Sequence, residues 1–192
     1  MKRILTLFAA LVLVPCVFAV ELETFTAKGN PKTMGVDFSI GRPKAWMTRP
    51  ANPTGTFAVF WQTPSGLVDS MTLIFPRTQS AQSEDVTKED FRTMFENPAL
   101  EQMLGRSLAN AKFLGKTILE DFKYPAGYIE YAGKYKLKSG EIEMKVRNYL
   151  IYLGNVMLQV QFYLVQEAGE DRLQQFDADM KQILASLEFT SP

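Results

Sequence analysis

The stretch that decides the fold runs from residue 142 to residue 164, IEMKVRNYLIYLGNVMLQVQFYL. Apolar side chains recur at every second position of both halves, which predicts two β-strands. They are Ile142, Met144, Val146, Leu150 and Tyr152 in the first half, and Val156, Leu158, Val160, Phe162 and Leu164 in the second. Gly154 and Asn155, between the halves, suit a two-residue hairpin turn that needs positive φ. Tyr149 and Ile151 lie opposite the first apolar row, so both faces of this hairpin are expected to be covered.

Further strands are expected on the N-terminal side of this hairpin. β-branched and aromatic residues at alternating positions mark these segments, which are residues 36–41, 56–63, 67–75, 113–122 and 127–137. Residues 56–63 and 67–75 flank a Pro-Ser-Gly turn and are expected to pair as a hairpin. The intervening segments are polar or rich in proline and glycine and are expected to be loops or a tail; they are residues 20–35, 47–56, 76–86 and 188–192.

Two segments show helical spacing of apolar residues. The first begins at Thr87-Lys88-Glu89-Asp90, which has the form of a capping box with Asp in place of Glu or Gln, and Pro98 is expected to interrupt it. The second carries one apolar stripe from Leu173 to Leu187. Runs of strands separated by single helices predict an α+β fold, with a mainly antiparallel sheet flanked by helices on both faces.

The N-terminus has the form of a secretory signal peptide. Met1-Lys2-Arg3 is basic, residues 4–17 are apolar, and Val17-Phe18-Ala19 is a small-residue cleavage pattern. We therefore expect residues 1–19 to be a signal peptide, residues 20–192 to form a single domain, and the product to be periplasmic or secreted. The alternative is a lipid anchor at Cys16, but Pro15 stands where a lipobox needs a small residue.

Composition limits the chemistry of the exported part. The chain has no histidine, and its only cysteine lies in the expected signal peptide. The side chains that carry most nucleophilic, general-base and transition-metal chemistry are thus missing, and no cofactor or metal is expected. The 21 basic and 21 acidic residues balance, so nucleic acid is not an expected partner. No later apolar run reaches the length of a membrane span, so no transmembrane helix is expected after cleavage.

Two segments resemble the PsbP-like family, which is named for an extrinsic subunit of photosystem II. Residues 36–46, VDFSIGRPKAW, are similar to the family's opening pattern, and residues 183–189, ILASLEF, are similar to its closing one. The amphipathic helix between two groups of strands is similar as well. The resemblance implies an α/β/α sandwich, and its motifs are structural. Family metal sites that use histidine cannot transfer to this chain, and no photosynthetic role follows.

Three polar patterns are possible sites of chemistry. Gly115-Lys116-Thr117 lacks the earlier glycine of a phosphate loop and precedes a strand, which argues against nucleotide binding. The acidic residues from Glu84 to Asp90 could bind calcium, but a helix N-terminus explains them better. Carboxylates on strands, among them Asp69, Glu130 and Glu143, could serve a hydrolase but are more typical of solvated rows. We therefore expect no enzymatic activity.

The remaining candidates are aromatic or lie in a proline-containing loop. The residues expected to contact a ligand or partner are Trp46, Arg49, Asn52, Trp61, Tyr128 and Tyr149. Tryptophan and tyrosine are enriched in interfaces and pockets, although on strands they are more often core residues.

Three functions remain open. The first is a non-catalytic accessory protein of the cell envelope that contacts another envelope protein. The second is a small-molecule or lipid carrier with an apolar pocket, and the third is a carboxylate-based hydrolase. An interface should show exposed aromatic residues rimmed by Arg and Lys. A carrier should show an enclosed apolar cavity, and a hydrolase two buried carboxylates in one cleft.

Overall fold

A computed structural model describes residues 19–50, 56–61, 70–76, 84–104, 108–137, 140–165 and 170–190. The strands are β1 (Leu22–Ala27), β2 (Asp37–Pro43), β3 (Met47–Pro50), β4 (Thr56–Trp61), β5 (Ser70–Ile74), β6 (Ala109–Ile118), β7 (Ala126–Leu137), β8 (Gly140–Leu153), β9 (Val156–Val165) and β10 (Glu188–Thr190). The helices are η1 (Pro31–Thr33), α1 (Lys88–Phe95), α2 (Ala99–Leu104) and α3 (Glu170–Ala185). None of the described helices is long and apolar enough to cross a membrane.

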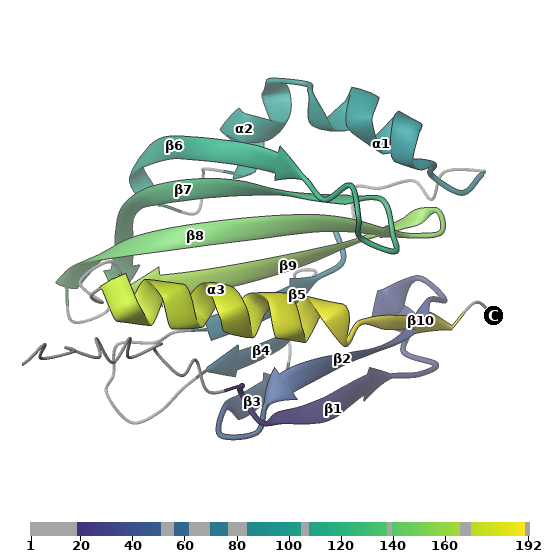
Figure 1. Ribbon diagram of the computed structural model, residues 1–192, viewed down its shortest axis with the longest axis horizontal. Helices are drawn as coiled ribbons and strands as arrows, with labels where there is room; N and C mark the ends of the chain where they lie inside the picture. The colour runs from purple at the N-terminus through teal and green to yellow at the C-terminus, as the bar shows by residue number, and fades with distance from the viewer. Residues whose placement is uncertain are drawn as a thin grey trace, which may run out of the picture.

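The described strands form two antiparallel sheets, which confirms the α+β class and the mainly antiparallel sheet (Figure 1). The larger sheet has the order β3-β4-β5-β9-β8-β7-β6, and the smaller has the order β1-β2-β10. The deciding hairpin is β8 and β9, which pair from Met144↔Val165 to Leu153↔Val156. Gly154 in its turn has φ +65°, as the two-residue loop requires. The expected hairpin of β4 and β5 also forms, with Phe60 opposite Met71.

Alternate residues of β8 enter two different hydrophobic clusters. Tyr149, Ile151 and Leu153 pack in one cluster with buried residues of β2, β4, β5, β9 and α3. Met144, Val146 and Leu150 pack in the other, with Phe91 and Phe95 of α1. The two faces of the strand therefore contribute to two separate cores, which is the burial that the sequence pattern predicted for this hairpin.

The smaller sheet corrects two expectations about loops. Residues 20–35 were expected to be a loop, but they contain β1, which pairs with β2 from Leu22↔Pro43 to Ala27↔Phe38. The tail after Leu187 contains β10, which pairs with the other edge of β2. Phe25 of β1 explains the first case, because its ring lies 5.1 Å from Phe60 and 5.8 Å from Phe57 in edge-to-face contacts. Phe25, together with Leu22 and the buried Ala27, thus anchors this strand to the core.

A further correction concerns residues 47–56, which were expected to form a loop. Residues 47–50 form β3, which pairs with β4 from Met47↔Trp61 to Pro50↔Ala58. Pro50 lies at the end of this strand, and β3 is an edge of the larger sheet, where proline is tolerated because one side of the strand needs no donor. Proline in residues 47–56 is therefore compatible with an edge strand and does not by itself indicate a loop.

Candidate functional site

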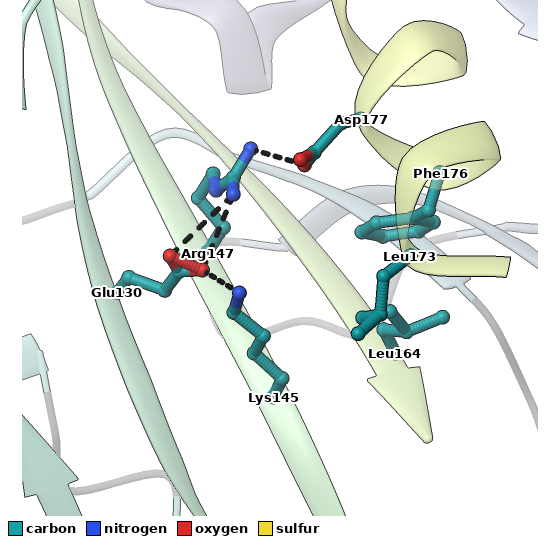
Figure 2. Close-up of a pocket in the computed structure, with 7 residues that line it drawn as sticks. All are labelled: Glu130, Lys145, Arg147, Leu164, Leu173, Phe176 and Asp177. Carbon is teal, nitrogen blue, oxygen red and sulfur yellow. Dashed lines mark hydrogen bonds and ion pairs between the residues drawn. The ribbon is translucent and has the colours of Figure 1, made fainter. Parts of the chain in front are cut away.

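A cluster of charged side chains lies where α3 meets β7 and β8. Lys145 and Arg147 alternate on β8, on the same side of the strand as Tyr149. The register places Arg147 opposite Glu130 of β7, and Tyr149 opposite Tyr128. Regular strand geometry therefore brings these side chains to one face, because residues directly opposite in an antiparallel pair point the same way. We call four residues the charged cluster: Glu130 of β7, Lys145 and Arg147 of β8, and Asp177 of α3 (Figure 2).

Arg147 is the centre of the charged cluster. Its Nη1 lies 2.9 Å from Asp177 Oδ1, and its Nη2 lies 3.2 Å from Glu130 Oε1. The guanidinium also lies 4.7 Å from the centre of the Tyr128 ring, within the range of a cation–π interaction. Only 13% of the Arg147 side chain is exposed, so these contacts form largely out of water. A single side chain thereby connects β7, β8 and α3.

Burial and neighbouring groups shift the pKa of Arg147 in opposite directions. Burial alone would lower the pKa of Arg147, but Tyr149, Glu130 and Asp177 together raise it, so the guanidinium stays charged. Burial raises the pKa of the Tyr149 hydroxyl, and Arg147 opposes that shift. Glu130, with 12% of its side chain exposed, also accepts a 2.5 Å contact from Lys145 Nζ. Every charge of the cluster therefore faces an opposite charge.

A small hollow lies beside this cluster. One wall consists of Glu130, Lys145, Arg147 and Asp177, and the other consists of Leu164, Leu173 and Phe176 (Figure 2). Its empty volume is about 250 Å³, part of which is open solvent. Pockets that enclose a drug-sized ligand usually hold roughly 300–1,000 Å³. The hollow is better described as a notch in a surface than as a cavity.

Comparison with solved structures identifies the architecture. The chain is similar to cyanobacterial PsbP (CyanoP) from Synechocystis sp. PCC 6803, at a TM-score of 0.50 and 11% identity, over 94% of this chain and 99% of that one. The chain has a PsbP-like fold. LpqN, a protein involved in cell envelope biogenesis of Mycobacterium tuberculosis, matches at a TM-score of 0.46 and 9% identity, over 88% of this chain and 91% of that one. No protein-family profile matches the chain, and no curated protein sequence does.

The two segments that resemble the PsbP-like family meet in the smaller sheet. Phe38 of the first segment pairs with Phe189 of the second, through β2 and β10. Between them, the backbone N–H of Gly41 donates a 2.6 Å hydrogen bond to Ser186 Oγ. A Cβ atom at Gly41 would lie 2.7 Å from that oxygen, so a larger residue would have to displace the Ser186 side chain from this hydrogen bond. These motifs therefore join the two ends of the PsbP-like fold, and they do so away from the charged cluster.

The PsbP-like fold brings only some of the six candidate residues together. The Tyr128 and Tyr149 rings lie 5.2 Å apart beside Arg147. Trp46 is partly buried and packs against the hydrophobic cluster that contains the apolar residues of α3. Arg49 lies in β3, opposite Val59, and not in the expected loop, while Trp61 pairs with Met47 through β4. Asn52 lies outside the described residues. β3 and β7 are separated by β4, β5, β9 and β8, so the candidates fall into two groups.

Sequence reasoning missed Lys145, Arg147 and Asp177. A signal was present in residues 142–152, because a strand that is apolar on both faces carries two cations at alternating positions. An unneutralised cation would be costly on a strand that is otherwise buried, so this pattern predicts an acidic partner on a neighbouring strand or helix. Glu130 was expected to belong to a solvated row of strand charges, but only 12% of its side chain is exposed and it pairs with Arg147.

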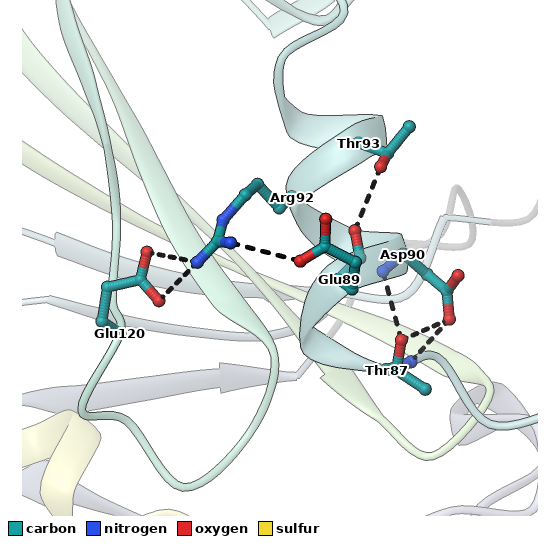
Figure 3. Close-up of polar contacts among 6 residues, drawn as sticks. All are labelled: Thr87, Glu89, Asp90, Arg92, Thr93 and Glu120. Atoms are coloured by element: carbon teal, nitrogen blue, oxygen red, sulfur yellow. Dashed lines mark hydrogen bonds and ion pairs between the residues drawn. The ribbon is translucent and has the colours of Figure 1, made fainter.

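A capping box and two ion pairs hold the acidic residues Glu89, Asp90 and Glu120 at α1 (Figure 3). Thr87 and Asp90 form a capping box, in which the Asp90 N–H donates to Thr87 Oγ1 at 3.2 Å and the Thr87 N–H donates to Asp90 Oδ2 at 3.1 Å. Hydrogen bonds from the Thr87 side chain, and then from its backbone, lower the pKa of Asp90. Arg92 binds Glu89 and Glu120. Among the described residues, no group of three metal-binding side chains lies together.

Proposed function

We infer that the protein is an exported, non-catalytic accessory protein of the cell envelope. We further infer that it binds another protein through the side of β7 and β8 that carries Tyr128 and the charged cluster. The observation that carries this inference is the position of the cluster beside α3. In Figure 1, α3 lies across β9 and β5, and most of β6 and β7 lies beyond it. Aromatic and cationic side chains therefore lie at the border of a sheet face that α3 leaves open.

The chemistry of this surface suits a protein interface. Tyrosine and arginine are enriched among residues that dominate binding energy, and a ring and a guanidinium already held in place lose little entropy on binding. Tyr128 and Arg147 are held in this way, by each other and by the ion pairs of the cluster. Lys145 and Asp177, with 31% and 49% of their side chains exposed, form the polar rim.

The alternatives fit the described residues less well. The apolar wall of Leu164, Leu173 and Phe176 supports a carrier, but the opposite wall is charged and the hollow is small. A hydrolase with two carboxylates needs one of them free to protonate a leaving group. Glu130 and Asp177 both bind Arg147 instead, so neither of these carboxylates is free for that role.

The rest of the proposal concerns export and architecture. We infer that residues 1–19 are removed, that residues 20–192 form one PsbP-like domain, and that α1 and α3 lie on opposite faces of the larger sheet as an α/β/α sandwich. The two separate clusters around α1 and α3 support this arrangement. Mass analysis of the purified product should give a chain beginning at Val20. A lipid-modified Cys16 would instead place the protein on a membrane by its N-terminus.

The interface is tested by affinity capture from the envelope fraction. The wild-type chain should retain a protein partner that Tyr128→Ala and Lys145→Glu lose by at least tenfold. Lys181→Glu is the matched control, because it reverses an equally charged side chain on the exposed side of α3. Circular dichroism establishes that all variants are folded. Equal retention of the partner by wild type, Lys145→Glu and Lys181→Glu would refute the proposed surface.

A further inference from the structure

The two sheets formed by the described residues end in four edge strands, which are β3, β6, β1 and β10. Three of these edges are poor templates for a further strand. The pairing of β6 with β7 shifts register twice, β3 is four residues long and ends at Pro50, and β10 has only three residues. Bulges, proline and short length all limit the addition of a strand to an edge. The remaining edge, β1, has none of these features.

β1 presents an uninterrupted backbone edge. Its six residues, LETFTA, contain no proline and no lysine, and they pair with β2 without a shift in register. Among the described residues β1 pairs with β2 alone, so the other side of the strand carries the unpaired backbone groups of an edge. Glu23, Thr24 and Thr26 are exposed, and β1 lies along the lower margin of the molecule in Figure 1. Such an edge is recognised by another extended strand.

The sequence of β1 is suited to pairing with itself. Thr24, Phe25 and Thr26 read the same in both directions. An antiparallel pair centred on Phe25 therefore places the two Phe25 side chains opposite each other, and it places Thr24 opposite Thr26 of the second copy twice. Aromatic pairs and Thr–Thr pairs across strands both stabilise an antiparallel ladder. The pairing is also symmetric, as the contact between two copies in a closed dimer must be.

The charges at this edge do not oppose the pairing. In the register centred on Phe25, Glu23 lies opposite Ala27 of the second copy, so the two Glu23 side chains do not face each other. The Glu23 carboxylate is also paired within its own chain, with Arg42 at 2.7 Å, and Glu21 is paired with Lys44 at 2.7 Å. Like charges directly opposite each other would destabilise a strand pair, and this register avoids them.

We propose that β1 pairs with β1 of a second copy of this chain, antiparallel and centred on Phe25, to form a symmetric dimer. The two smaller sheets then become one continuous sheet. A single strand pair is smaller than a standard protein interface, so the dimer is reversible and forms at high protein concentration. β1 belongs to the smaller sheet, whereas the charged cluster lies on β7, β8 and α3. Dimerisation is therefore a second contact, independent of the proposed function.

Sedimentation velocity over a range of protein concentrations tests the dimer. We expect the purified exported chain to change from the mass of one chain to that of two as its concentration rises. Thr24→Lys with Thr26→Lys places lysines directly opposite each other at two points and should raise the dissociation constant about tenfold or more. Thr24→Glu with Thr26→Lys is the matched control, because it changes the same exposed positions but places opposite charges across the pair. It should dimerise at least as tightly as the wild type, and circular dichroism establishes that both variants are folded.

Disulfide formation tests the register. The only cysteine of the sequence is Cys16, in the expected signal peptide, so introduced cysteines have no competitor in the exported chain. A mixture of Thr24→Cys and Thr26→Cys chains should crosslink about tenfold more under mild oxidation than either variant alone, because only the mixture places two cysteines directly opposite each other. A wild-type chain that stays monomeric at every concentration, or equal dimerisation of the two charge variants, would overturn the proposal. Equal crosslinking of the mixture and the single variants would overturn the register centred on Phe25.

Discussion

The two halves of β8 have different surroundings although they belong to one continuous strand. From Asn148 to Leu153 every residue is buried, because one side contributes to the cluster of α3 and the other to the cluster of α1. Residues 140–143 are exposed or partly exposed, and from Met144 to Arg147 buried and partly exposed residues alternate, with Lys145 and Arg147 in the charged cluster. The first half therefore lies at the border of the apolar core. The comparison teaches that the site arises where the cover of one sheet face ends.

The strongest test of the covered half is Phe176→Ala. Phe176 is 8% exposed and contacts Phe162 of β9 edge to face, at 6.0 Å. Truncating a buried ring of this kind should lower the free energy of unfolding by about 3–5 kcal/mol. Urea denaturation measures the change, and Lys181→Ala on the exposed side of α3 should alter it by less than about 0.5 kcal/mol. An unchanged midpoint would mean that α3 contributes little to the core.

Arg147→Met tests the border between the halves. Losing the guanidinium leaves Glu130 with only Lys145, and it removes the contact with Asp177. Fully buried pairs cost about 3–5 kcal/mol when one partner is removed, and this pair is partly exposed, so we expect about 1–3 kcal/mol. Lys145→Met, at a more exposed position, should cost less in the same urea titration. If the two variants were equally stable, Arg147 would not be the centre of the cluster.

Tyr131 provides a comparison from the opposite face of β7. Its hydroxyl donates to the carbonyl of Glu101 in α2, and burial raises its pKa to about 12. The folded pKa lies above the ordinary value of about 10, so folding favours the protonated hydroxyl of Tyr131. The stability that this hydroxyl contributes is therefore complete below pH 10 and is lost as pH rises toward 12. Tyr131→Phe should cost about 1 kcal/mol at neutral pH and remove that loss. An ultraviolet titration that shows Tyr131 ionising near pH 10 would contradict the buried environment.

Asp177→Asn should have the smallest effect. Asp177 is about half exposed, and exposed ion pairs contribute roughly 0–1 kcal/mol. We therefore expect a loss of less than about 1 kcal/mol, with Arg147 still held by Glu130. A loss as large as that of Arg147→Met, measured under the same conditions, would show that the contact with α3 and not the pairing across β7 and β8 holds the cluster.

Most of the fold could be predicted from the sequence because the patterns that indicate it are local. The β8–β9 turn, the capping box at Thr87 and the stripe on α3 each depend on residues close in sequence. β1 and β10 could not be predicted in this way, because their burial depends on Phe25 and Phe189 meeting residues distant in sequence. The candidate site followed the same rule. Tyr128 and Tyr149 were named as single residues, but their link to Arg147 required the register of β7 and β8.

Site-specific photocrosslinking in cells tests the central claim most directly. A photoreactive residue at position 145 lies on the proposed interface, and the same residue at exposed position 181 of α3 serves as its control. We expect a discrete crosslinked envelope protein from position 145 that is absent from position 181 and lost when Tyr128→Ala is added. Crosslinks of equal yield from both positions, or none from position 145 in intact cells, would contradict binding through this face of β7 and β8.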